Sequence, residues 1–135
     1  MTSRNYYWLI AGILCLLTAL VHTIGGQFEL VDPLMVGSLS PTAKVQWLGV
    51  WHVVTVMLFG GAFWLIRGGW LPASASLALL NNIAYLFVLF AVVFVVASIA
   101  QGIHALQWVL LLPIGLLTII GSRRVETTNV NQELN

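Results

Sequence analysis

Residues 84–97 read AYLFVLFAVVFVVA, and this run decides the class of the fold because it is apolar on every side of a helix. It belongs to a longer apolar stretch, and a helix of roughly 20 residues crosses about 30 Å of hydrocarbon. Four stretches reach that length, at about residues 6–24, 41–67, 73–100 and 103–122. Because a backbone in lipid must satisfy its hydrogen bonds internally, the sequence predicts an all-α, integral membrane four-helix bundle over residues 1–124.

The composition places the chain in the lipid bilayer. Of its 135 residues, 60% are hydrophobic and 7% are charged, and the mean hydropathy is +0.99. These values lie far outside the range of soluble domains. The net charge of +1 provides no basic field for phosphates, which excludes nucleic acid as a partner. The single cysteine, Cys15, cannot form an internal disulfide.

The basic residues predict the orientation of the chain. Four of them lie at one end of the predicted helices and one lies at the other end: Arg4, Arg67, Arg123 and Arg124, against Lys44. The positive-inside rule then places both termini in the cytoplasm, and we expect a bacterial-type inner membrane.

The segments between the helices carry capping and turn residues. Ser40 and Pro41 predict the start of the second helix, as N-cap and first-turn proline. Gln101 and Gly102 predict a tight hairpin between the third and fourth helices. The segment over residues 25–46 predicts a long outward loop that folds back as a lid, and residues 125–135 predict a polar cytoplasmic tail, disordered or lying on the surface.

The three histidines of the chain are predicted to share one depth in the bilayer. With a helical rise of about 1.5 Å per residue, His22 lies roughly 27 Å from Arg4, His52 roughly 22 Å from Arg67, and His104 roughly 28 Å from Arg123. Ionisable groups are costly in hydrocarbon and tend to mark functional sites. The sequence therefore predicts a histidine layer near the outer interface.

Neighbouring residues complete a candidate site. Glu29 is an outward carboxylate that follows His22, whereas Asp32 precedes a proline and is explained by a turn. Imidazoles with a carboxylate suit a first-row metal such as Zn, Fe or Cu. We therefore expect a catalytic or metal site formed by His22, His52, His104 and Glu29, with substrate contacts from Trp51, Trp108, Gln107 and Thr55.

Several functions remain open at this stage. The leading hypothesis is a small membrane enzyme, metal-dependent or acid/base, that acts on an apolar or lipid-like substrate. Two of the histidines could instead ligate haem, although the sequence holds no Cys-x-x-Cys-His attachment motif. Each histidine alone is also compatible with a purely structural role. The competing class is a non-enzymatic accessory subunit or scaffold, as a homo-oligomer or within a larger membrane complex.

Overall fold

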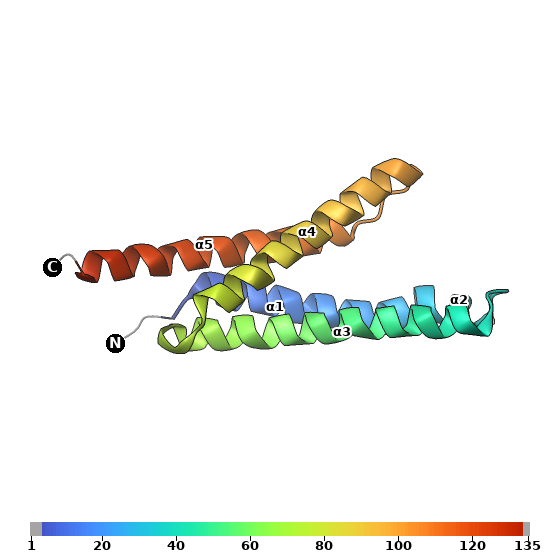
Figure 1. Ribbon diagram of the computed structural model, residues 1–135, viewed down its shortest axis with the longest axis horizontal. Helices are drawn as coiled ribbons and strands as arrows, with labels where there is room; N and C mark the ends of the chain where they lie inside the picture. Colours follow the sequence, from blue (N-terminus) through green and yellow to red (C-terminus); the bar gives the residue numbers. More distant parts are fainter. Residues whose placement is uncertain (1–3, 134–135) are drawn as a thin grey trace.

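A computed structural model describes residues 4–133 of the chain, and the side chains of residues 4–127 (Figure 1). The described part is helical and contains no strand. Four helical segments are long and apolar enough to cross a membrane: Tyr6–Val36, Pro41–Trp70, Leu77–Gln101 and Gln107–Thr127. The all-helical class predicted from the sequence is therefore confirmed, and its spans are compatible with a membrane protein.

The first span is longer than predicted, because the expected outward loop is mostly helical. Helix α1 (Tyr6–Leu20) continues through two π-helical turns, η1 (Val21–Gly25) and η2 (Gln27–Val31), into α2 (Asp32–Val36). Pro33 lies in the first turn of α2, where a missing N–H costs little. The long loop over residues 25–46 is thus a wrong prediction, and only residues 37–40 connect the first span to the second.

The remaining helix ends agree with their local chemistry. Helix α3 (Pro41–Trp70) starts as predicted, since the Ser40 hydroxyl accepts a hydrogen bond from the Ala43 N–H at 3.2 Å. A short 3₁₀ turn, η3 (Pro72–Ser74), precedes α4 (Leu77–Gln101), so this span begins after the predicted residue 73. Gly102 ends α4 in the left-handed region at φ 64°, which confirms the turn at this position.

Helix α5 (Gln107–Glu133) differs from its prediction at both ends. It begins four residues after the predicted residue 103, because residues 102–106 form the turn that follows α4. Its backbone remains helical through most of the segment that was predicted as a disordered or surface-lying tail. The segment after residue 124 has few apolar residues with which to pack on the bundle. Adding residues to an existing helix costs little, however, so the helix can continue through this segment.

The spans pack side by side, with α1 between α3 and α5 and with α4 against α5 (Figure 1). Small residues make this close approach possible. A Cβ at Gly12 would lie 2.8 Å from the Ile66 backbone N, and one at Gly115 would lie 2.8 Å from the Ala84 carbonyl oxygen. Helix association in lipid depends on such small residues, which let the backbones pack closely.

Polar groups join three helices at the end where the chain begins. The Asn5 backbone N–H donates to the Gly69 carbonyl at 2.9 Å, and its side-chain amide donates to the Gly121 carbonyl at 2.9 Å. The Trp8 indole N–H donates to the Thr118 carbonyl at 3.1 Å. Asn5 and Trp8 are both buried, so these bonds form in a site that water does not reach easily.

Burial is concentrated at this end of the bundle and in the middle of the spans. The buried residues of α4 lie between Leu80 and Ala91, and no residue over 92–101 is buried. Residues 107–110 at the start of α5 are likewise exposed. Figure 1 shows the reason, since α4 tilts away from α1 and α3 towards the turn that precedes α5, whereas α5 runs alongside α1. The last part of α4 therefore extends beyond the packed part of the bundle.

Replacement of Asn5 by Ala tests the hydrogen bonds that Asn5 and Trp8 make between the helices. The substitution leaves the Gly121 carbonyl and the Trp8 backbone N–H without their side-chain partner, and we expect it to lower the free energy of unfolding by about 1–2 kcal/mol. The matched control is Asn82→Ala on α4, because Asn82 is exposed and forms no side-chain hydrogen bond in the described part of the chain. Unfolding in detergent measures both variants, and equal stabilities would contradict this role for Asn5.

Candidate functional site

The backbone of the first span changes its winding where the predicted site residues lie. His22 lies in the π-helical turn η1, and Glu29 lies in the π-helical turn η2. A π-helical turn holds an extra residue compared with an α-helical one and thereby redirects the side chains around it. Such turns are rare and are frequent at functional sites. The geometry of this segment is therefore a reason to examine its neighbours on α3.

His22 lies flat against Trp51 of α3. The two ring centroids are 3.9 Å apart and the ring planes differ by 17°. The His22 Nε2 lies 3.4 Å from the Trp51 carbonyl oxygen, which also accepts a hydrogen bond from the Thr55 hydroxyl at 3.1 Å. Because a carbonyl can only accept, Nε2 carries the proton of this long hydrogen bond. The other ring nitrogen, Nδ1, then serves as the acceptor of a neutral imidazole.

Gly26 allows the Trp51 ring to take this position. A Cβ at residue 26 would lie 2.3 Å from the Trp51 Cη2 and 2.5 Å from its Cζ2, so no side chain fits there while the indole is present. The neighbouring Gly25 is different, because a Cβ there would meet only Val21 Cγ1 at 4.0 Å. The packing of Trp51 therefore requires a glycine at residue 26 but not at residue 25.

The same indole forms part of the wall of an apolar cavity of about 150 Å³. The other lining residues come from η2, from α2 and from the first part of α3: Leu30, Val31, Leu34, Trp47 and Leu48. Trp51 is buried, whereas His22 is half-buried and His52 is exposed. The cavity and the imidazole of His22 thus share Trp51 as a common wall.

The predicted site residues fall into two groups in the structure. His52 lies close enough to His22 for their charges to interact, and Thr55 reaches the carbonyl that faces His22. By contrast, His104 belongs to the turn after α4, and Gln107 and Trp108 begin α5. That turn lies at the end where α4 tilts away from α1 and α3 (Figure 1).

The predicted metal centre is not assembled within one chain. Among the described residues, no group of three or more His, Cys, Asp or Glu side chains is placed to hold a metal ion. Glu29 is exposed and comes seven residues after His22 along the helix. The physical reason is that a helix count fixes the depth of each histidine in the membrane but not its lateral position. The prediction of a single cluster of His22, His52, His104 and Glu29 is corrected to the local group of His22, His52, Trp51 and Thr55.

Two features of the site were missed by the sequence reasoning. The cavity residues were missed because their segment was interpreted as a loop. A signal was present, since Leu30, Val31 and Leu34 have the spacing of one helix face, as do Trp47, Leu48 and Trp51. Gly26 was missed because a Gly-Gly pair is typical of a turn.

Comparison with protein-family models, with curated proteins and with solved structures finds no match for this chain. The function must therefore be argued from the geometry and chemistry of the site itself.

The adjacent glycines provide a test of the Trp51 position. In Gly26→Ala the new methyl group occupies the space of the indole, so we expect Trp51 to move and its stacking on His22 to be lost. Protein labelled with 5-fluorotryptophan shows each of the six tryptophans by ¹⁹F NMR, with the Trp51 signal assigned from Trp51→Phe. Gly26→Ala should shift that signal and Gly25→Ala should not. A Trp51 signal that responds equally to both variants would refute the proposed contact.

Proposed function

We propose that this chain is an integral membrane protein that binds the apolar part of a lipid-like molecule at the outward end of its first two spans. In this proposal, His22 presents a proton donor or acceptor to the polar end of the same molecule. One observation carries the proposal. The Trp51 indole is stacked on His22 at a centroid distance of 3.9 Å and also lines the apolar cavity of about 150 Å³.

The lengths of the spans support a location at the outer interface. Tyr6–Val36 and Pro41–Trp70 contain 31 and 30 residues, or about 45 Å of helix each, which exceeds a hydrocarbon thickness of about 30 Å. If the arginines lie on the cytoplasmic side, His22 lies about 24 Å from Tyr6 and thus near the outer boundary of the hydrocarbon. At this depth, a molecule with an apolar tail and a polar head keeps its tail in the hydrocarbon and its head at the aqueous boundary.

The volume of the cavity indicates that it encloses only part of the ligand. Sites that enclose a drug-sized molecule usually measure about 300–1,000 Å³, whereas this cavity measures about 150 Å³. It therefore accommodates one ring or a short chain segment, while the rest of the ligand stays in lipid. A quinone, a prenyl alcohol or the polar end of an acyl lipid satisfies this condition.

The imidazoles favour acid/base chemistry over metal chemistry. His22 has a partner for Nε2 at the Trp51 carbonyl, and Nδ1 has no hydrogen-bond partner among the described residues, so it can accept a hydrogen bond or a proton from a ligand. His52 is exposed and close to His22, so it can exchange protons with the aqueous phase. A metal site in one chain lacks a third protein ligand of the usual type among the described residues. We therefore assign His22 as the residue that faces the ligand head and His52 as its link to solvent.

A second candidate function, an accessory subunit, is favoured by the exposed outward part of α4. No residue over 92–101 is buried, and α3 and α4 make few contacts with each other. A partner helix placed there would bury a continuous apolar surface. A change of both His22 and His52 to Gln separates the two candidates, because it leaves this surface intact and removes the imidazoles of the proposed binding site.

Tryptophan fluorescence tests the binding proposal directly. Decylubiquinone combines a small ring with an apolar chain and quenches indole emission on contact. Titration of the protein in nanodiscs should give saturable quenching. Trp51→Phe should reduce its amplitude and leave the part that comes from Trp47, which lines the same cavity. His22→Gln should shift it to about 2–10-fold higher quinone concentration, as expected for one lost hydrogen bond. Trp64→Phe is the matched control, since Trp64 lies elsewhere on α3 and is exposed.

Quenching that rises linearly and equally in all of these variants would rule out quinone binding at this site. Elemental analysis of the same preparations tests the metal alternative. Near-stoichiometric Zn, Fe or Cu that is lost in His52→Ala would replace the acid/base proposal by a metal site completed between chains.

A further inference from the structure

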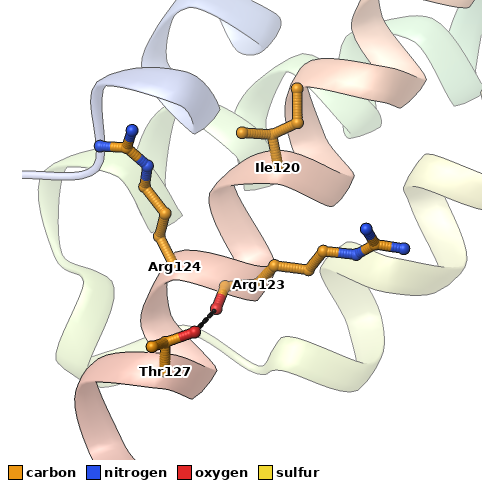
Figure 2. Close-up of a pocket in the computed structure, with 4 residues that line it drawn as sticks. All are labelled: Ile120, Arg123, Arg124 and Thr127. Carbon is orange, nitrogen blue, oxygen red and sulfur yellow. Dashed lines mark hydrogen bonds between the residues drawn. The ribbon is translucent and has the colours of Figure 1, made fainter.

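A second cavity, which is a shallow depression open to the surface, lies at the opposite end of the molecule, on α5. It has a volume of about 410 Å³ and is lined by Ile120, Arg123, Arg124 and Thr127. The last three follow Ile120 by three, four and seven residues, so all four border the same side of the helix. Figure 2 shows the two arginine side chains diverging from this side, one to each edge of the depression. The proposed ligand site at Trp51 does not include any of these residues.

The basic character of this surface rests on Arg123. The Arg124 guanidinium lies over the Tyr7 ring at 4.7 Å from its centroid, and this contact directs it towards α1. Arg123 is exposed and forms no ion pair within the described part of the chain. The Thr127 hydroxyl donates to the Arg123 carbonyl at 2.9 Å (Figure 2). Two positive charges thus border one cavity.

The cavity has an apolar side and a polar side along α5, as a site at a membrane interface would have. Gly121 accepts the hydrogen bond from Asn5, so this part of α5 lies at the end where Arg4 covers the Trp70 ring at 3.8 Å. Ile120 faces the cavity from the side of the apolar span, and Thr127 lies about 10 Å further along the helix. The lining therefore changes from apolar to basic and polar over the depth of a phospholipid headgroup region.

We infer that this cavity binds the phosphodiester headgroup of an anionic phospholipid from the adjacent leaflet. Arginine suits this ligand because its guanidinium donates several hydrogen bonds to phosphate oxygens and keeps its charge. Basic pockets beside the cytoplasmic ends of spans are typical sites for such headgroups. Inorganic phosphate carries the same charge, but it has no apolar part to contact Ile120. The inference does not depend on the function proposed for the outward site.

Native mass spectrometry of the full chain in detergent tests the inference with phosphatidylglycerol as the probe. Arg123→Gln should weaken phosphatidylglycerol binding at least about fivefold, because it removes a charge-assisted hydrogen bond to the phosphate and not only a nearby charge. Arg67→Gln is the matched control, because it removes the same charge from an exposed residue in the last turn of α3 and lies outside the cavity. It should bind within about twofold of the unchanged chain.

Thr127 offers a second pair of variants that keeps both arginines. Thr127→Glu adds a carboxylate one turn from Arg123 and should weaken binding at least as much as Arg123→Gln, whereas the isosteric Thr127→Gln should not. Circular dichroism confirms that each variant retains its helix content. Zwitterionic phosphatidylcholine should bind the unchanged chain more weakly than phosphatidylglycerol does.

Two results would overturn the inference. The first is an equal loss of phosphatidylglycerol binding in Arg123→Gln and Arg67→Gln, which would reduce the effect to net charge. The second is full displacement of phosphatidylglycerol by inorganic phosphate at an equal concentration, which would assign the cavity to free phosphate and not to a lipid.

Discussion

The contact of the Trp51 indole with the backbone of Gly26 determines how the first span packs against α3 beyond Leu20. Because no side chain fits at residue 26, the ring lies directly against the first span and holds it beside α3 beyond Leu20. The His22 imidazole then stacks on the indole, and the apolar residues of η2, α2 and α3 surround a cavity on the same ring. Without this contact, neither the stacked pair nor the cavity wall would exist.

The two ends of the molecule differ in how closely their helices pack. At the inward end, glycines let helices approach closely and buried Asn5 and Trp8 tie α1 to α3 and α5 through backbone carbonyls. Helices in lipid gain little from burying apolar surface, so this packing and these hydrogen bonds must supply the stability. At the other end, no residue of α4 over residues 92–101 is buried, although Phe94 still packs against the core. The buried contacts that stabilise the bundle are therefore concentrated towards the end that holds Asn5 and in the middle of the spans.

The fold was largely predictable because apolar length is a local property of the sequence. The number of apolar stretches, the Ser40 cap and the turn at Gly102 all follow from neighbouring residues. Lateral placement is not local, and this explains the main errors. His22 packs on Trp51 of α3, whereas His104, which was predicted at the same depth, belongs to the turn after α4, at the end where α4 tilts away from α1 and α3. The Gly25-Gly26 pair was placed in the predicted loop over residues 25–46, because nothing in its own segment indicates that an indole from α3 requires the second glycine.

Hydrogen–deuterium exchange in nanodiscs, resolved along residues 27–40, measures most directly whether the first span continues as a helix beside α3. The account predicts slow exchange for the amides of η2, of α2 and of Gly37, whose N–H donates to the Pro33 carbonyl at 3.0 Å, and fast exchange for residues 38–40. Equally fast exchange across the whole segment would show an open loop and would contradict the continuous span on which the site depends.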